Sequence, residues 1–301
     1  MRMVLKSKYK FYLTLCGELI LSPWLYFKNF MKWHFGDSKK VDFINRVRVP
    51  VDGNKLSVCV HEWGGYEGKR IKKIKNIAEF ECGLDYQLKR FQNYKGKYEV
   101  DLTVTISDAH LLKNKIVKAN VIEVANEGMD FSGYATFFET IKNEENQYVI
   151  LTNSSVNKVN VDFIDDYLDF FSKDQTIGML GVSCNSKMYQ TFIRNNFNPH
   201  LQSFFLLTTT EVLKEIVKKN NGFPGKGIDH KLALIRNGEI KLSRIVMDLG
   251  YKLVCILEDG KPLFFDKKCY VDNGKESWGN FFMDYRLFLK SPNAISSLKL
   301  K

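Results

Sequence analysis

Apolar and polar residues follow one another in blocks whose spacing predicts alternating strands and helices. An apolar run rich in β-branched residues ends at Ala125, and a second apolar run covers residues 148–151. Between them, apolar residues recur at the spacing of one helix face: Phe131, Tyr134, Ala135, Phe138 and Ile141. Two strands joined through a helix are normally parallel, so this segment predicts one strand–helix–strand unit.

The remaining blocks extend the same pattern. Strands are predicted at residues 55–61, 100–106 and 176–183, and helices at residues 80–91, 161–171, 188–197 and 239–249. Strands that alternate with helices predict an α/β fold with a mostly parallel sheet flanked by helices. Polar residues follow several of these strands, and open α/β sheets bind ligands at their carboxyl edge. We therefore expect the functional site at that edge.

The amino end differs from the rest of the chain. Residues 11–35 are dense in aromatic residues and leucines, with lysines before and among them. Glu18, Pro23 and Lys28 argue against a membrane-spanning helix, and no small-residue cleavage site of a signal peptide follows. We expect an amphipathic helical segment that lies in a membrane interface. The alternative is a helical hairpin packed on the domain or on another subunit.

These patterns divide the chain into three parts. Residues 1–40 form the helical extension, residues 41–260 form one α/β domain, and residues 261–301 form a tail. The tail is expected to be a helix with a basic end, packed on the domain or near the membrane. Its apolar residues are Trp278, Phe281, Phe282, Tyr285, Leu287 and Phe288.

Composition narrows the classes of partner. The 301 residues carry a formal net charge of +11, which favours acidic partners such as nucleotide diphosphates or an anionic membrane surface. A merely basic, soluble surface is the alternative. Nucleic-acid binding would rest on charge alone, without a recognisable module, so we expect none. The six cysteines are scattered without a Cys-x-x-Cys pair, which favours a reduced, cytoplasmic compartment.

A family resemblance rests on the central unit. The run N-E-G-M-D-F-S-G-Y at residues 126–134, a helix, and the run Y-V-I-L-T-N-S-S-V at residues 148–156 resemble the inverting nucleotide-sugar glycosyltransferases of family 2. The bacterial surface-polysaccharide transferases related to rhamnan synthesis proteins are the more similar group. The resemblance covers roughly residues 55–257. It implies a Rossmann-like fold of the glycosyltransferase A type.

The resemblance also implies an activity. It points to transfer of a hexose-like sugar, with inversion, from a UDP or dTDP donor to a glycan or lipid-linked acceptor. The pathway would be capsule or O-antigen (lipopolysaccharide) biosynthesis, at the inner face of the plasma membrane. The alternative is a non-catalytic relative that binds a sugar nucleotide or glycan, because the family's acidic cluster is missing from this chain.

The resemblance suggests donor-binding residues at the ends of the predicted strands. Asp108 suits ribose hydroxyls or a base N–H, because a carboxylate only accepts hydrogen bonds; capping of a helix is its alternative role. The aromatic Trp63 could stack on the base, and Arg244 could meet phosphate. The donor-side candidates are His61, Glu62, Trp63, Asp108, Asn126, Gly128, Asn153, Ser154, Ser155 and Arg244.

The metal requirement is where this chain departs from the family. Asn153-Ser154-Ser155 stands where the resembled enzymes carry an acidic cluster for Mg²⁺ or Mn²⁺. Amide and hydroxyl oxygens are poor substitutes for carboxylates around such an ion. We therefore expect activity without a metal.

The catalytic base is expected near the last predicted helix. Glu239 follows Gly238 and matches the place of the family's acidic base, although it is a single acid; Asp229 is the reserve. A glutamate in a first helical turn is also favoured by the helix dipole alone. His200 and Gln202 are the acceptor-side candidates, with structural hydrogen bonds as the alternative. The glycine-rich loop at residues 220–227 is either a mobile lid or a simple turn.

Overall fold

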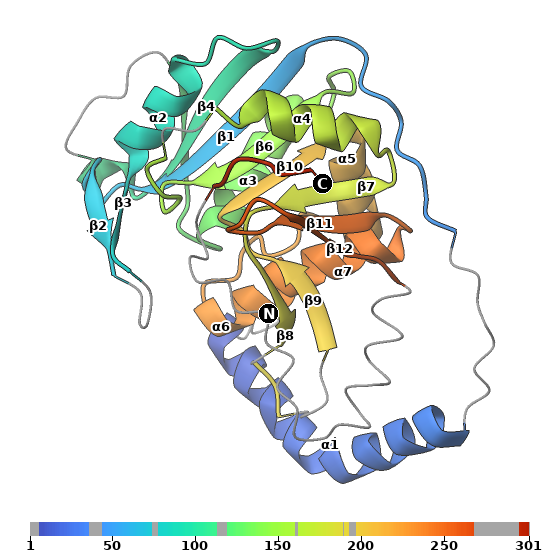
Figure 1. Ribbon diagram of the computed structural model, residues 1–301. Coiled ribbons are helices and arrows are strands. Elements are labelled where there is room, and N and C mark those ends of the chain that lie inside the picture. Colours follow the sequence, from blue (N-terminus) through green and yellow to red (C-terminus); the bar gives the residue numbers. More distant parts are fainter. Residues whose placement is uncertain are drawn as a thin grey trace.

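One eight-stranded sheet organises the chain (Figure 1). The computed structural model describes residues 6–35, 44–73, 78–112, 119–159, 162–188, 190–192, 197–267 and 295–300. The strands of the large sheet are β1 (Lys55–Trp63), β4 (Glu99–Ser107), β5 (Asn120–Val124), β6 (Tyr148–Asn153), β7 (Ile177–Gly181), β10 (Phe205–Thr209), β11 (Lys252–Ile256) and β12 (Pro262–Phe265). Their order across the sheet is β12-β11-β7-β10-β6-β1-β4-β5.

Most of these strands run in one direction. β5, β4, β1 and β6 are parallel neighbours, and β11 is parallel to β7. β10 runs against both β6 and β7, and β12 runs against β11 at the edge. The mostly parallel sheet that the sequence predicts is therefore confirmed. Such sheets are covered on both faces, which explains why every residue of β6 is buried.

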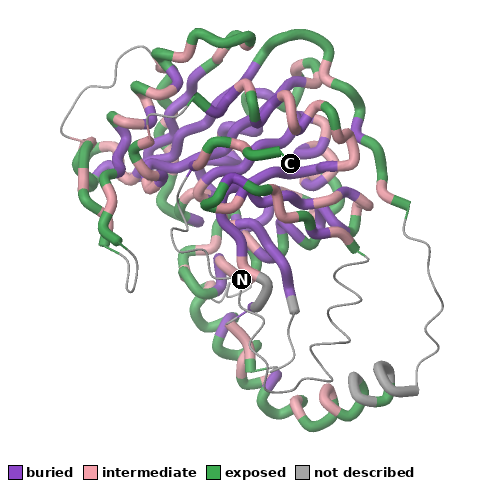
Figure 2. Tube along the Cα trace, viewed as in Figure 1, coloured by how far each residue is buried: buried purple, intermediate pink, exposed green. Residues whose placement is uncertain are grey.

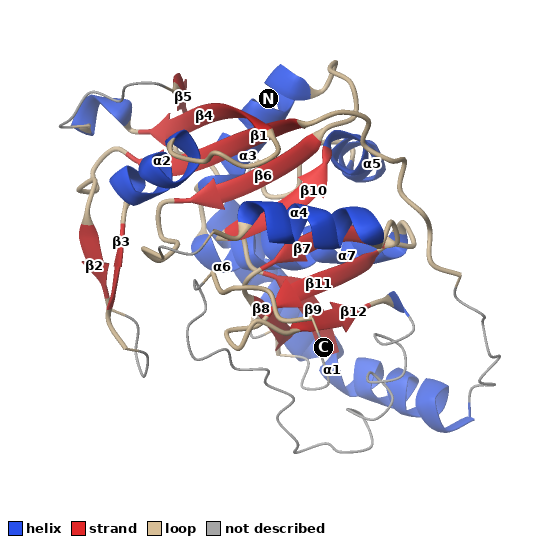
Figure 3. Ribbon diagram, turned by 45° about the horizontal axis from the view of Figure 1, so that its top comes forward, coloured by secondary structure: helices blue, strands red, loops and turns tan. Residues whose placement is uncertain are grey.

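Helices cover both faces of the sheet (Figure 3). α2 (Leu84–Gln92) and α4 (Ile164–Lys173) pack into one apolar core with β1, β4 and β10. α3 (Asp130–Ile141), α5 (Thr210–Asn220) and α7 (Lys241–Asp248) pack into a second core on the opposite face. The helix face predicted from the spacing of apolar residues in α3 is confirmed, since all five side chains are at most 3% exposed.

Shorter elements complete the described chain. β2 (Arg70–Lys72) pairs with β3 (Phe80–Cys82), and β8 (Cys184–Lys187) pairs with β9 (Phe197–Leu201). The one-turn helix η1 (Ala109–Leu111) follows β4. α6 (Lys231–Leu234), the π-helix η2 (Ile235–Ile240) and α7 follow one another without a break, so residues 231–248 form one helical rod.

Two helix predictions are wrong in part. The predicted helix at residues 80–91 begins only at Leu84, because Phe80–Cys82 pairs with β2 and Gly83 takes a backbone φ of 135°. The described residues of the predicted helix at 188–197 are not helical, and Phe197 begins β9. The large sheet reaches Phe265, beyond the expected domain end at residue 260. The apolar tail residues Trp278 to Phe288 lie outside the described residues.

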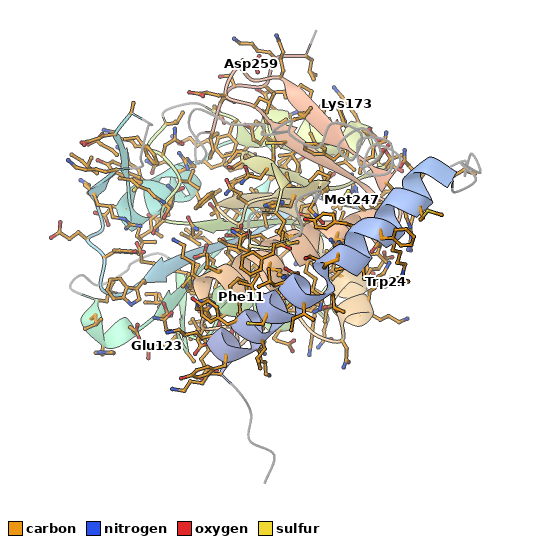
Figure 4. The ribbon with its side chains drawn as sticks, turned by 90° about the horizontal axis from the view of Figure 1, so that it is seen from below. Phe11, Trp24, Glu123, Lys173, Met247 and Asp259 are labelled. Carbon is orange, nitrogen blue, oxygen red and sulfur yellow. The ribbon has the colours of Figure 1, made fainter. Side chains whose placement is uncertain are left out.

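The amino-terminal helix α1 (Ser7–Phe35) lies across the underside of the domain, with Phe11 near the end from which the chain starts (Figure 4). Figure 2 shows that most of its described length is exposed. Pro23 lies inside the helix, which changes direction along its length in Figure 1. No helix among the described residues is long and apolar enough to cross a membrane.

The close approach of α3 to the sheet gives a stability prediction. A methyl group on Gly133 would lie 2.3 Å from His61 Nδ1 and 2.4 Å from Thr105 Oγ1. We expect Gly133→Ala to lower the free energy of unfolding by about 1–3 kcal/mol, because overpacking outweighs the gain in helix propensity. Urea unfolding followed by circular dichroism measures this change.

Gly17→Ala is the matched control, because nothing lies within 4 Å of the added methyl group in α1. This substitution should be neutral or slightly stabilising. Equal effects of the two substitutions would show that α3 can move away from the sheet at little cost.

Candidate functional site

Polar side chains from three parallel strands meet at the carboxyl edge of the sheet. The register places His61 of β1 opposite Thr105 of β4 and Asn153 of β6, so the residues that follow these strands are neighbours. β10 is antiparallel, and its amino end therefore reaches the same edge. The edge thus combines the ends of β1, β4 and β6 with Ser203, just before β10.

The first group at this edge centres on Asp108. Its Oδ2 accepts hydrogen bonds from Trp63 Nε1 at 2.7 Å and from Asn126 Nδ2 at 2.8 Å. The Asp108 side chain makes no capping hydrogen bond to η1, although the residue stands at the cap position. The ring of Trp63 also contacts Tyr66 edge to face, with centroids 4.8 Å apart. The donor candidates Trp63, Asp108 and Asn126 therefore form one hydrogen-bonded set.

The second group holds a buried carboxylate. Glu62 is 2% exposed and accepts from Ser154 Oγ at 2.7 Å and from Arg70 Nη1 at 3.2 Å. Arg70 also donates to Ser154 Oγ at 2.7 Å, and its guanidinium lies 4.2 Å from the centre of the Tyr66 ring. Burial raises the pKa of Glu62, while the charge of Arg70 and the hydrogen bonds oppose that shift.

The third group joins two carboxylates through one hydroxyl. Ser203 Oγ lies 2.9 Å from Glu239 Oε1 and 3.2 Å from Asp130 Oδ2. Asn153 Nδ2 donates to the same Asp130 oxygen at 2.6 Å, and the Ser203 backbone N–H donates to Glu239 at 3.2 Å. A serine hydroxyl carries a single proton and donates fully to only one acceptor. The carboxyl groups of Asp130 and Glu239 therefore compete for it.

Glu239 lies in the π-helix η2, in the middle of the helical rod. The prediction that it opens a helix is wrong, because the rod begins eight residues earlier, at Lys231. Glu239 therefore does not lie in the first turn of that rod. Burial raises the pKa of Glu239 from 4.5 to about 7, and Asp130 adds to the shift; Ser203 and Lys231 oppose it. A carboxyl group with this pKa can exchange a proton near neutral pH.

Cations lie beside the acidic groups. Lys72 of β2 is partly buried, and its ammonium lies 5.0 Å from the centre of the Phe204 ring. Burial lowers the pKa of Lys72, while the charge of Asp130 acts in the opposite direction. Arg70 and Lys72 thus bring positive charge from one short strand to the edge where Asp130 lies.

Several candidate residues are occupied by structural contacts. His61 is buried, and its Nδ1 lies 3.1 Å from Thr105 Oγ1; burial lowers its pKa. His200 is also buried, with Nδ1 2.7 Å from the carbonyl oxygen of Asn198 and a pKa lowered by burial to about 4. The Gln202 side chain accepts from Ser183 Oγ. These contacts match the structural alternative for both acceptor-side candidates.

Other candidates lie outside the three groups. Arg244 is exposed and donates to Asn198 on β9. Asp229 is exposed, in the loop before α6. Ser155 is partly buried, and its backbone N–H donates to Asn153 Oδ1 at 2.9 Å. The structure therefore does not bring Arg244 or Asp229 into the cluster around Glu239.

The turn at Gly128 is in contact with the glycine-rich loop at residues 220–227. Gly128 has a φ of 119°, and a methyl group on it would lie 2.9 Å from the carbonyl oxygen of Gly225. The Gly227 N–H donates to the Glu127 carbonyl at 2.9 Å. The loop is therefore anchored at the same edge of the sheet. Its opening as a lid stays a prediction.

Two residues of the site escape sequence-based assignment. Asp130 opens α3, where an acid is commonly a capping residue, yet its carboxylate binds Asn153 and Ser203, and no side-chain cap precedes α3. Ser203 belongs to no recognisable motif; it lies two residues before β10. The signal that could have found it is the direction of β10, because an antiparallel strand begins where its parallel neighbours end.

The described residues hold no group of three or more histidine, cysteine, aspartate or glutamate side chains placed to bind a metal ion. At Asn153-Ser154-Ser155 the side chains of Asn153 and Ser154 are both engaged in hydrogen bonds within the site. The polar set fits hydrogen-bonded recognition of a ligand better than direct coordination of a divalent cation.

These features define an α/β protein with a polar site at the carboxyl edge of its parallel strands, where such folds bind ligands. No protein-family description and no curated protein matches the sequence. Three solved structures show a distant similarity of fold. CMP:2-keto-3-deoxy-manno-octonic acid synthetase in complex with CTP is 10% identical, with a TM-score of 0.41 over 66% of this chain and 88% of the synthetase.

TarS from S. aureus is 14% identical, with a TM-score of 0.35 over 64% of this chain and 34% of TarS. The mannosyltransferase PcManGT from Pyrobaculum calidifontis, in complex with GDP-Man and Mn²⁺, is 13% identical. Its TM-score is 0.36 over 82% of this chain and 65% of the mannosyltransferase. This chain thus spans about a third of TarS and just under two thirds of the mannosyltransferase.

The raised pKa of Glu239 gives a prediction about stability and pH. The folded chain holds this proton up to about pH 7, whereas an unfolded glutamate loses it near 4.5. Native stability is therefore lost as the pH rises through this window. Glutamine resembles the protonated acid and avoids that loss. We expect Glu239→Gln to raise the free energy of unfolding at pH 8, with a gain that shrinks towards pH 4.5.

Urea unfolding of both proteins across this pH range measures the difference. Glu258→Gln, at an exposed turn, is the matched control and should show no trend with pH. A difference between Glu239→Gln and the wild-type chain that stays constant with pH would mean that folding does not shift the pKa of Glu239.

Proposed function

We propose that this chain is an inverting glycosyltransferase that uses a UDP or dTDP sugar. One observation carries the proposal: a carboxyl group with a pKa near 7, Glu239, lies at the carboxyl edge of the sheet beside a second carboxylate. A general base works best when its pKa is close to the working pH. The hydrogen-bonded groups around Glu62 and Asp108 supply a binding surface for a polar ligand at the same edge.

The donor nucleotide would lie against the Asp108 group. Asp108 and Asn126 offer an acceptor and an amide for ribose hydroxyls and the edge of the base. The rings of Trp63 and Tyr66 offer apolar faces; Tyr66 is 48% exposed and so is open to a planar base. Ser154 and Asn153 complete the wall on the side of β6.

The diphosphate would lie towards the cations of β2. Arg70 is anchored by Glu62 and Ser154, which fixes its guanidinium before a ligand arrives. A fixed positive charge stabilises a leaving diphosphate more than a mobile one does, because little reorganisation is needed during reaction. Arg70 and Lys72 would take the role that a metal ion plays in other enzymes of this chemistry.

The reaction follows from this arrangement. The oxygen of the acceptor hydroxyl forms a bond to the anomeric carbon on the face opposite the diphosphate. The bond from that carbon to the diphosphate oxygen breaks, and its electron pair leaves with the diphosphate. The acceptor proton passes to the carboxylate of Glu239. Ser203 holds that carboxylate in place through its N–H and hydroxyl, and general-base assistance of this kind contributes about 10²–10⁴ in rate.

Glu239→Gln tests the role of the base. Glutamine keeps the size of the side chain but cannot accept the proton, so turnover should fall about 10²-fold or more with donor affinity little changed. Release of nucleoside diphosphate from UDP and dTDP sugars, with a lipid-linked or oligosaccharide acceptor, measures turnover.

Assays in chelator should retain full activity, because the proposed diphosphate contacts are Arg70 and Lys72.

The control is Asp229→Asn, an exposed acid outside the cluster, which should keep normal turnover. Normal turnover in Glu239→Gln would exclude Glu239 as the base. Activity that disappears in chelator and returns with Mn²⁺ would exclude the metal-free arrangement.

A second candidate function is non-catalytic binding of a sugar nucleotide or glycan. The observation that favours it is the internal pairing of the polar groups at the edge, where Arg70 is already bonded to Glu62 and Ser154. A wild-type chain that gains thermal stability with a sugar nucleotide, yet transfers to no acceptor, would support this function instead.

We also propose that α1 brings the enzyme to the cytoplasmic face of an anionic membrane, where a lipid-linked acceptor of capsule or O-antigen synthesis would be found. Among the side chains of α1 that the structure describes, nine large apolar ones are exposed: Tyr9, Tyr12, Leu13, Leu19, Ile20, Leu21, Trp24, Phe27 and Met31. Lys8, Lys10 and Lys28 on the same helix are exposed as well. Each basic residue near an anionic surface contributes about 1 kcal/mol to binding.

Replacing Trp24 and Phe27 together by serine tests this contact. Their rings lie 6.2 Å apart, and they are 61% and 56% exposed, so the fold should survive the change. We expect affinity for phosphatidylglycerol-containing vesicles to fall about 10-fold or more, because burial of each ring in the interface is lost. Vesicle sedimentation measures binding. Ile71→Ser, at an exposed apolar residue of β2, is the control. Equal vesicle binding by this control and by the variant with serine at Trp24 and Phe27 would assign α1 to protein packing.

A further inference from the structure

The helix α1 touches the helical rod of residues 231–248 at two points. The first contact is aromatic: the Phe11 and Tyr12 rings lie 5.2 Å and 5.7 Å from the imidazole of His230. His230 stands at the cap position of α6, directly before the rod. Phe11 is only 4% exposed, so this end of α1 is buried against the domain.

The second contact is a buried ion pair. Glu18 is 7% exposed, and its Oε1 accepts from Arg236 Nη2 at 2.5 Å. The other oxygen accepts from Thr191 Oγ1 at 2.7 Å and from the Phe192 N–H at 3.2 Å. Arg236 in turn donates to the Gln190 carbonyl at 3.4 Å. One carboxylate therefore ties α1 to the rod and to residues 190–192.

Arg236 occupies a special place in the rod. It lies in the π-helix η2, three residues before Glu239 and thus on the same turn. A π-helical turn is rare and is frequently found at a functional site. Contacts from outside the rod reach η2 from β9, from the ion pair with Glu18, and from Phe131 of α3, whose ring lies 3.1 Å from where a methyl group on Gly238 would be.

We propose that Glu18 and Arg236 are positioning residues for Glu239, so that the amino-terminal helix is a working part of the catalytic site. The ion pair holds one side of η2 while α3 holds the other, and the winding between them directs the Glu239 carboxylate to Ser203. This inference rests on the proposed function for its kinetic consequences, whereas its structural consequence stands independently.

Removing one charge of the pair should disturb the winding of η2. The remaining charged side chain would be buried without its partner, so it would draw in water or move towards water. The charges that face Glu239 itself come from α3 and α6, namely Asp130 and Lys231, and neither is altered by a change at Glu18. The double variant Glu18→Gln/Arg236→Gln has the net charge of the wild type, so a shift of the working pH that remains in it must pass through the position of the carboxylate.

Glu18→Gln, Arg236→Gln and the double variant form a cycle that tests the proposal. We expect each single variant to lower kcat about 10-fold or more, with the donor KM little changed, because a small displacement of the base is enough to slow catalysis. The acidic limb of the kcat profile against pH should move as well. In the Arg236→Gln background, Glu18→Gln should have little further effect, since both changes remove the same contact.

The control is Glu139→Gln, which removes an exposed ion pair with Lys142 on α3 and should change nothing. Equal losses of thermal stability without a change in kcat or in the pH profile would overturn the proposal and leave a purely structural ion pair. Additive effects of Glu18→Gln and Arg236→Gln on kcat would overturn it too.

Hydrogen exchange separates this inference from the proposed function. In the full chain without any substrate, Glu18→Gln should speed amide exchange in residues 235–240 and leave α4 (Ile164–Lys173) as in the wild type. Faster exchange in η2 with no transferase activity in the wild-type chain would contradict the proposed function and keep the coupling. Unchanged exchange in η2 together with normal kcat would contradict the coupling and keep the function.

Discussion

Carboxylates withdrawn from water need hydrogen-bond donors, and this requirement organises the carboxyl edge of the sheet. Glu62 has Arg70, Ser154 and a backbone N–H, while Asp108 has Trp63 and Asn126. Each of these donors comes from a different strand end or loop than the acid it serves, apart from the residue next to Glu62. The parallel strands place the acids at one edge, and the donors then fix the loops around them.

The pair formed by Asp130 and Glu239 meets the requirement least well. Ser203 supplies one hydroxyl proton to two carboxylates, so the cluster is most stable when it holds one extra proton. The requirement for this extra proton lowers the free energy of unfolding at neutral pH. Under the proposed function, the group that holds the proton is the base for the reaction. Sites that bind protons for chemistry often carry such a cost, which the rest of the fold must offset. Here two extended cores, one on each face of the sheet, offset it.

The sequence predicts the elements of the sheet better than the details of the site. The predicted strands are readable because they are short segments rich in apolar and β-branched residues, and α3 is readable because its apolar residues recur at helical spacing. The start of α2 is misread, because Phe80–Cys82 is apolar at positions that also fit a helix, and pairing with β2 decides between the two. Glu239 is proposed as the base from its place along the chain, but the π-turn around it contacts Glu18 and Phe131, which are distant in sequence.

The central position of β10 has a consequence for how the chain assembles. Residues 55–153 contain β1, β4, β5 and β6, which are adjacent in the finished sheet and complete before β7 exists. β7 cannot join them directly, because β10 comes between β6 and β7 and follows β7 by more than twenty residues. Until β10 forms, β6 presents an apolar strand with one unpaired side, the kind of edge on which chains aggregate. Synthesis of this protein therefore passes through an interval in which a strand that is fully buried in the finished fold is its most vulnerable one.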